Sequence, residues 1–472
     1  MSGAAQRSGW QPARRLSRAM LACAAALLLG ACSSTRPWMN QPIAATSPMP
    51  APALVVPAVQ PGAQADTPSI IAAVTLSGGG ARAAAFGLGV LEELKATRLE
   101  IDGRQTTLLD EVGLISGVSG GSILAGYYAA FGDEVFTRFE RDFLLVNFQS
   151  GLIQDLLFPS TLYKLSSPWY GRSNAFARHL HTVFRGATFG DLRSQGPRRR
   201  LLVTATDLTT GAPFEFTPEQ FALICSDLDS VPLSVAVAAS SAVPLLLSPV
   251  TVRNFAGSCP QAPASHEEQP DRNLSARLLR LIADAYRNAD ERPYIHLVDG
   301  GLVDNLGVRS LLDRTVASGS LNATFGGLRP GSVHKIVLVS VNSERDTTER
   351  IDRSDRVPSI SQVLDALVFG AGSRVTTETT AMLNDTTLRL SEELQAARGR
   401  PGSPFAADAE VHVVNVRLRD LQDSSNALLR VPTALTILPG QVGELKSAGR
   451  QALRESAEFQ RLRSSLDAES RE

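Results

Sequence analysis

The sequence is poor in the residues that build metal centres. Its 472 residues include four cysteines and six histidines, and no group of them has the spacing of metal ligands, so we expect neither a metal nor another cofactor. Charge is balanced, with 46 basic and 47 acidic residues and a formal net charge of −1. This balance argues against a nucleic-acid partner, because proteins that bind nucleic acid concentrate positive charge. We find no internal repeat, and the length suits one large α/β domain or two small ones.

An apolar run at residues 20–29 is too short to span a bilayer as a permanent helix. Three arginines in residues 14–18 precede it, and small residues lead to Cys32, a pattern that resembles a bacterial lipoprotein signal. The resemblance implies that residues 1–31 are removed and that Cys32 becomes a lipidated N-terminus. Ser33 then indicates the outer membrane of the cell envelope, facing the periplasm. An ordinary secretory signal and a twin-arginine signal are the alternatives.

Residues 32–68 are rich in proline and alanine and predict a semi-extended tether with freedom to approach or leave the membrane. At roughly 3 Å per residue it spans up to about 100 Å. We expect a catalytic domain over residues 69–350 and an α/β extension packed on it over residues 351–472. In an oxidising periplasm the two remaining thiols, Cys225 and Cys259, either form a bridge or stay free, and the sequence leaves both open.

A serine turn lies between two predicted elements. Residues 112–116 form an apolar run that predicts a buried strand, and residues 122–131 predict a helix. Gly-Val-Ser-Gly-Gly at 117–121 joins them in a G-x-S-x-G pattern. The glycines permit a sharp, strained turn from which the hydroxyl of Ser119 projects as a nucleophile. A glycine-rich turn with an incidental serine is the alternative.

A glycine loop follows the first predicted strand, residues 70–76. It reads Ser-Gly-Gly-Gly-Ala-Arg at 77–82 and precedes a predicted helix. Bare amides there suit an anion, and three glycines supply them: Gly78, Gly79 and Gly80. The anion is either a dinucleotide phosphate or a transient oxyanion. The dinucleotide alternative arises because the loop together with Ala83 fits G-x-G-x-x-A and Glu100 follows at a suitable distance. The serine turn favours the oxyanion.

An aspartate ends another predicted strand, residues 294–298, in the sequence Asp-Gly-Gly at 299–301. The carboxyl ends of parallel strands share one edge of a sheet, so we expect the three loops to meet there. Ser119 would attack a carbonyl, Asp299 would take its proton, and the glycine amides would hold the oxyanion. Asp207 and Asp304 are the competing acids, and we expect each to stabilise its own turn.

The three motifs resemble those of patatin-like phospholipases in order and spacing, over about residues 70–345. The resemblance implies an α/β three-layer sandwich with a mostly parallel central sheet flanked by helices. It also implies a Ser119–Asp299 dyad, an acyl-serine intermediate and metal-free hydrolysis of membrane phospholipids or other lipid esters. Arg82 would hold a lipid phosphate or, in a structural role, a nearby carboxylate. Ala83 stands where the family usually has glycine, which matters only if that position needs a positive φ.

Two rival functions stay open. One is an α/β-hydrolase esterase whose triad adds His334 or His412 to Ser119 and Asp299. The other is a catalytically silent scaffold lipoprotein of the envelope, against which the intact motifs argue. The substrate itself is open among phospholipids, lysophospholipids, neutral esters and thioesters.

Four further stretches have recognisable patterns. Residues 134–185 are helical and rich in phenylalanine, and we expect mostly ordinary helix packing with some residues lining an acyl groove or a mobile flap. Residues 257–292 are polar and predict a surface insertion that contains one helix. Residues 335–341 and 411–416 predict two more strands.

Overall fold

Eight strands form the central sheet in the computed structural model, which describes residues 33–44, 69–101, 103–196, 200–259, 273–325, 327–344, 354–366, 371–421 and 425–469. Seven of the strands lie in the order β10 (Phe405–Arg417), β9 (Val333–Asn342), β1 (Ile70–Leu76), β4 (Val112–Gly117), β5 (Arg200–Asp207), β8 (Tyr294–Val298) and β7 (Val250–Arg253). The strand β6 (Pro213–Glu215) pairs with β5 alone, and β2 (Arg98–Ile101) and β3 (Arg104–Thr107) form a separate hairpin.

The sheet is mostly parallel, as predicted. All pairings from β10 across to β5 are parallel, whereas β8 runs antiparallel to both β5 and β7. Side chains alternate along β9: Val337 and Val339 point into the main core, while Ile336 and Leu338 belong to two smaller clusters on the other face. Both faces are therefore buried, which is typical of parallel sheets.

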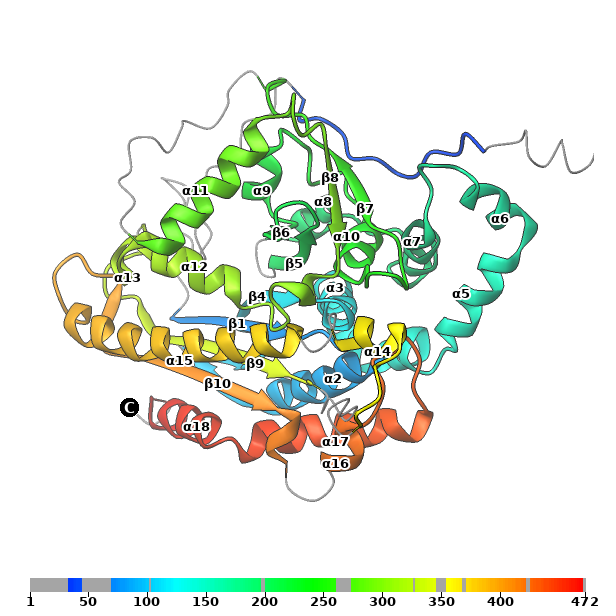
Figure 1. The fold of residues 1–472 in the computed structure, drawn as a ribbon. Coiled ribbons are helices and arrows are strands. Elements are labelled where there is room, and N and C mark those ends of the chain that lie inside the picture. Colours follow the sequence, from blue (N-terminus) through cyan, green and yellow to red (C-terminus); the bar gives the residue numbers. More distant parts are fainter. Residues whose placement is uncertain are drawn as a thin grey trace, which may run out of the picture.

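Helices cover the two faces and complete a three-layer sandwich (Figure 1). One layer contains α2 (Gly80–Ala96), α3 (Gly120–Phe131), α17 (Pro439–Glu455) and α18 (Ala457–Glu469). The opposite layer contains α12 (Arg309–Ser318), α13 (Leu321–Thr324) and α15 (Ala371–Ala397). Since α17 packs along α2 and β10 pairs along β9, the last third of the chain completes the same sheet and core.

The remaining helices lie around these layers (Figure 1). They are α4 (Val135–Phe139), α5 (Phe148–Leu157), α6 (Pro159–Leu165), α7 (Arg172–Val183), α8 (Phe189–Ser194), α9 (Pro218–Leu223), α10 (Leu233–Ser240), α11 (Leu274–Arg287), α14 (Ile360–Asp365) and α16 (Ser425–Leu429). The helical prediction for residues 134–185 is confirmed, and α11 is the helix expected in the polar stretch. Among the described helices, none has both the length and the apolar composition that crossing a membrane requires.

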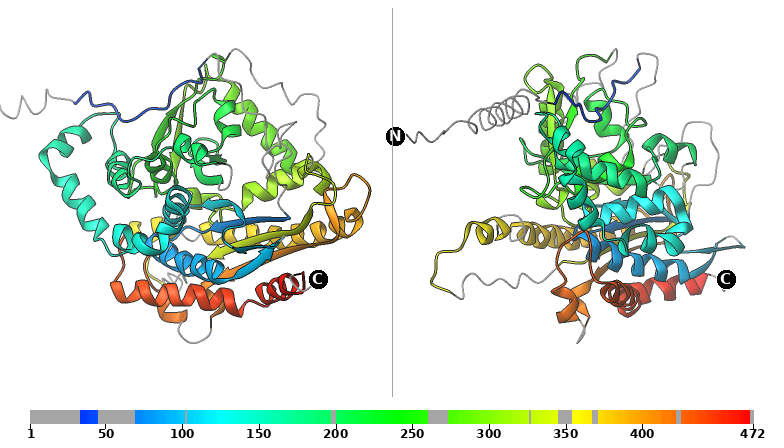
Figure 2. Two further views of the ribbon diagram at one scale, coloured as in Figure 1. Left: turned by 180° about the vertical axis from the view of Figure 1, so that it is seen from behind. Right: turned by 90° about the vertical axis from the view of Figure 1, so that its right-hand side faces the viewer.

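The N-terminal segment, residues 33–44, lies against the body of the protein, in dark blue in Figure 2. Asn40 is buried: its amide nitrogen donates to Ser226 Oγ (2.8 Å), and its Oδ1 accepts from the N–H of Arg253 (2.7 Å). Pro42 and Ser226 form an antiparallel bridge. This part of the predicted tether is extended but docked rather than free, because backbone pairing needs no apolar core. Cys32 and the predicted signal lie outside the described residues.

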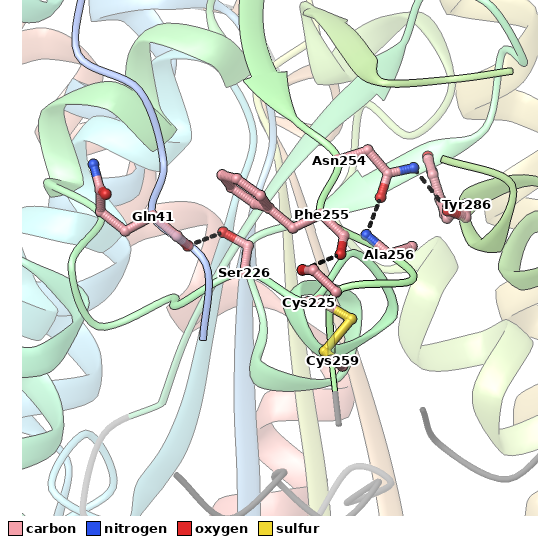
Figure 3. The surroundings of a disulfide bond; sticks show 9 residues. Gln41, Cys225, Ser226, Asn254, Phe255, Ala256, Cys259 and Tyr286 are labelled. Carbon is pink, nitrogen blue, oxygen red and sulfur yellow. Dashed lines mark hydrogen bonds between the residues drawn. A yellow bond between two sulfur atoms is a disulfide. The ribbon is translucent and has the colours of Figure 1, made fainter. Parts of the chain in front are cut away.

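A disulfide joins Cys225 to Cys259, with a Cα–Cα distance of 5.7 Å, so the structure selects the bridged alternative. It lies directly beside the docked segment: the Ser226 hydroxyl donates to the backbone oxygen of Gln41 (3.0 Å), as Figure 3 shows. The N–H of Ile43 donates to the carbonyl of Cys225 itself (3.0 Å). The bridge thus holds the strip of chain on which the N-terminal segment docks.

Candidate active site

Ser119 occupies the sharp turn between β4 and α3 with φ +49°, a strained conformation for a residue other than glycine. The flanking glycines are required by close approach: a Cβ on Gly117 would lie 2.6 Å from the Ser122 Cα, and one on Gly121 would lie 2.4 Å from a Leu76 carbonyl. The N–H of Ser119 donates to Ser240 Oγ (2.9 Å). The turn predicted at this motif is therefore present, and α10 fixes it from behind.

The strand that precedes Asp299 runs in a direction that the sequence did not indicate. We expected a parallel strand, but β8 is antiparallel, with Val298 opposite Thr206 and Leu297 opposite Asp207. Because β5 extends beyond the end of β4, where Gly117 pairs with Val203, β8 returns along this extension. It delivers Asp299 to the level of the serine turn. The Thr206 hydroxyl then donates to the Asp299 carbonyl (2.8 Å) and holds the strand end.

The carboxyl group of Asp299 is buried and only half satisfied. Its Oδ1 accepts from the Gly301 N–H (2.8 Å), while Oδ2 is buried with no hydrogen-bond partner among the described residues. Burial raises the pKa of Asp299 to about 6, although the Gly301 N–H and the nearby Ser119 hydroxyl oppose the rise. A carboxylate with a raised pKa and a free oxygen beside a serine is equipped to accept a proton.

The glycine loop provides fewer donors than predicted. The N–H of Gly78 donates to the Asn305 carbonyl (3.0 Å), so that amide is already engaged. Gly79, with φ +138°, precedes α2, and Gly80, with φ +62°, begins it. Neither N–H has an acceptor within the described part of the chain. Two amides at a helix N-terminus, rather than three, are available to an anion.

Arg82 is 2% exposed and serves the backbone. Its Nε donates to the Ser343 carbonyl (2.9 Å) and its Nη1 to the Val431 carbonyl (2.7 Å). These contacts tie the glycine loop to two distant segments and account for the buried guanidinium. The alanine at position 83 is helical, without a positive φ, so the departure from glycine costs nothing there.

A cleft connects these groups, with a volume of about 70 Å³. Its wall combines the three motifs with residues that the sequence did not single out, namely Val243, Leu302, Asn305, Glu344, Gly372, Ser373 and Thr433. Four of these come from the last third of the chain. The Ala81 N–H also donates to the carbonyl of Ala434 (2.7 Å), next to Thr433. No local motif marks these positions, since their contribution depends on contacts far apart in sequence.

The competing acids are occupied elsewhere, as expected. Burial alone would raise the pKa of Asp207, but the hydrogen bond from Arg292 (2.5 Å) holds this pKa below its usual value. Burial raises the pKa of Asp304 to about 6, against the backbone N–H groups that oppose it. Two of these, from Gly307 (3.0 Å) and Arg309 (2.8 Å), occupy both carboxylate oxygens. Neither acid has an oxygen free to serve Ser119.

The predicted triad histidines do not approach the cleft. His334 is the second residue of β9, one residue before the Lys335–Ile70 pair, at the end of the sheet opposite to the cleft, and it pairs with Asp408 (3.0 Å). His412 lies within β10 between Glu410 and Glu458 (3.3 and 3.2 Å). The triad is therefore wrong for this fold.

Glu100, the acid that the dinucleotide hypothesis requires, is engaged elsewhere. Glu100 lies in the β2–β3 hairpin and accepts a hydrogen bond from Gln105 (2.7 Å). Within the described residues, no group of three or more His, Cys, Asp or Glu side chains is arranged to hold a metal.

The chain is similar to two solved structures and to one protein family. VipD from Legionella pneumophila aligns at 13% identity and a TM-score of 0.33, over 85% of this chain and 67% of its own. Human GIVD cytosolic phospholipase A2 aligns at 12% identity and a TM-score of 0.35, over 84% of this chain and 60% of its own. No curated protein sequence matches the chain. The model of the patatin-like phospholipase family matches residues 74–312, a range that holds the glycine loop, the serine turn and Asp299, and the chain belongs to this family.

Proposed function

We propose that the protein is a membrane-tethered lipid acyl hydrolase that uses Ser119 and Asp299 as a catalytic dyad. Family membership supports the lipid hydrolase. The dyad rests chiefly on one observation: Oδ2 of Asp299 is buried beside the Ser119 turn and has no hydrogen-bond partner among the described residues. Phospholipids of the surrounding membrane are the substrate class that fits a lipid anchor at Cys32 in the outer membrane.

The reaction proceeds in two balanced steps. Ser119 Oγ attacks the ester carbonyl carbon while its proton passes to Asp299, and the N–H groups of Gly79 and Gly80 stabilise the oxyanion. Collapse of the tetrahedral intermediate breaks the bond to the alcohol, which takes the proton from Asp299 and leaves an acyl-serine. Water then attacks the acyl-serine, giving up a proton to Asp299. The fatty acid departs, and the proton returns to Ser119.

The test combines an active-site probe with a natural lipid. The chain from Ser33 onward is incubated with a fluorophosphonate and with mixed-acyl phosphatidylethanolamine, beside Ser119→Ala and Asp299→Asn. Labelling and fatty acid release confined to wild type are expected. Ser241→Ala is the matched control, because this neighbouring serine is buried and its hydroxyl has no partner among the described residues. Labelling without phospholipid turnover would redirect the search to other esters, and no labelling of the folded chain would favour the silent scaffold.

The anchor is tested separately. Cells that express the full chain incorporate labelled palmitate into it, and Cys32→Ala abolishes the labelling. Persistent labelling of that variant would refute lipidation at Cys32.

A further inference from the structure

The helices α5 and α6 carry apolar side chains on their outer side. Leu157 and Phe158 are 68% and 62% exposed, and the surface also includes Ile153, Leu162, Tyr163 and Trp169. We call these six residues the α5–α6 surface. The inner side of α5 is apolar as well, since Phe148 packs edge-on against Phe176 of α7 (5.7 Å). A helix with apolar residues on both sides needs a second apolar neighbour.

The two helices project from the body of the protein beside the N-terminal segment (Figures 1 and 2). The N–H of Ser33 donates to Ser166 Oγ (3.2 Å), directly after α6. The Ser167 hydroxyl donates to the Thr35 carbonyl (2.7 Å), and the Arg36 guanidinium lies 3.4 Å from the centre of the Trp169 ring. The residue that follows the predicted lipid anchor is therefore held at the edge of the α5–α6 surface.

The charges around the surface suit lipid head groups. Between Phe143 and Arg172, a stretch described throughout, Asp155 is the single acidic residue, and it is paired with Arg178 (2.9 Å). Lys164 and Arg172 supply positive charge in and beside α6. Exposed leucine and aromatic side chains bordered by cations are typical of helices that lie in a membrane interface.

The surface also leads toward the cleft. Val243 lines the cleft, and its neighbours Leu245 and Leu246 are exposed. The Leu245 carbonyl accepts from Arg172 (2.7 Å), at the start of α7. The segment that contributes Val243 to the cleft is therefore linked to the start of α7, the helix that packs against α5.

We propose that the α5–α6 surface inserts into the head-group region of a lipid bilayer, on the side of the protein where the lipid anchor emerges. The proposal deepens the proposed function and rests on it for the anchor and the substrate. With Ser33 docked, the enzyme sits on the membrane in one orientation rather than swinging on a long tether. The mature N-terminus and the two helices then form one continuous contact.

Flotation with vesicles tests the surface without the anchor. The chain from Ser33 to Glu472, which holds every described residue and lacks Cys32, is mixed with phosphatidylethanolamine–phosphatidylglycerol vesicles. Leu157→Glu/Phe158→Glu should lower the bound fraction at least tenfold. Leu274→Glu/Leu281→Glu is the matched control, because these α11 residues are equally apolar and 67% and 57% exposed. The control should bind as wild type does, and thermal unfolding verifies that both variants fold.

A second readout places the surface in the membrane. Trp38 and Trp169 are the two tryptophans after Ser33, so in Trp38→Phe the emission of Trp169 alone is followed. Brominated lipid should quench this emission, and vesicles should shift it to shorter wavelength.

No binding by wild type, equal loss of binding in the α11 control, or unquenched Trp169 emission would overturn the proposal. So would a monomer–dimer equilibrium abolished by Leu157→Glu/Phe158→Glu while flotation persists, which would assign the surface to a second copy. Hydrolysis of a soluble short-chain ester by wild type reports the proposed function separately.

Discussion

Replacing Asp299 with asparagine should abolish hydrolysis and stabilise the fold. Asparagine has the same shape, and its amide oxygen can accept from the Gly301 N–H in place of Oδ1. The amide nitrogen then lies where Oδ2 is buried without a partner among the described residues. No contact is lost, and a buried charge is removed.

The magnitude follows from the pKa. Burial raises the pKa of Asp299 from 3.8 to about 6, and each unit corresponds to 1.36 kcal/mol, so ionisation costs the native state about 3 kcal/mol. The unfolded chain ionises near its ordinary pKa, so the stability of wild type falls as pH rises from about 4 to about 6 and is then level. The gain in Asp299→Asn should therefore be full at pH 8 and vanish near pH 4.

Urea unfolding at both pH values measures the effect. Asp304→Asn is the informative control, because burial raises that pKa to about 6 as well. Both oxygens of Asp304 accept backbone N–H groups, so in Asp304→Asn the amide nitrogen would face an N–H donor. This clash should destabilise the fold by about 1–3 kcal/mol and offset the stability gained by removing the buried charge. If Asp299→Asn unfolds at the same urea concentration as wild type at pH 8, or gains equally at pH 4, the burial argument is wrong.

The kcat/KM for a soluble ester should fall about tenfold per pH unit below the pKa of Asp299, about 6, and be level above it; a flat profile would exclude this base. Ser240→Ala should lower kcat about 10- to 100-fold with little change in KM, because the buried Ser119 N–H loses its acceptor, whereas a change in KM alone would assign Ser240 to binding. Reducing the Cys225–Cys259 bridge, whose cysteines are 34 residues apart, should lower the free energy of unfolding by about 4 kcal/mol in the chain-entropy model. Dithiothreitol should therefore lower the urea midpoint, and an unchanged midpoint would contradict this prediction. Arg82→Met should cost about 3 kcal/mol in urea unfolding, because two buried carbonyls lose their donor, and a change below about 0.5 kcal/mol would show that water replaces it.

The strand ends that carry the motifs were predictable from local sequence. The run at 70–76 is the strand Ile70–Leu76, and the run at 294–298 is Tyr294–Val298, because short apolar segments followed by glycine leave few alternatives. The direction of β8 was not predictable, since a five-residue apolar strand looks the same in parallel and antiparallel pairings. The loop that brings Asp299 to Ser119 depends on how far β5 extends, which no local pattern reports.

Contacts to backbone atoms escaped the sequence most completely. Ser240 accepts from a serine 121 positions earlier, and the Gly78 N–H is engaged by the Asn305 carbonyl. A backbone carbonyl has no side-chain signature, so nothing near residue 305 marks the lost oxyanion donor. The docking of residues 33–44 is similar: a proline-rich composition predicts no core, but a bridge at Pro42 and one buried asparagine, Asn40, need none.

The wall that Thr433 and Ala434 contribute has a consequence for the timing of activity. A growing chain that has reached residue 320 already holds all three motifs, but the Ala81 N–H lacks its acceptor and Arg82 lacks both of the carbonyls to which it donates. The three motifs therefore exist as sequence well before they come together in the cleft. Synthesis must pass Ala434, and the strand at Phe405–Arg417 must join the sheet, before the chain can cleave a lipid. Partly made copies are therefore expected to lack the proposed hydrolase activity.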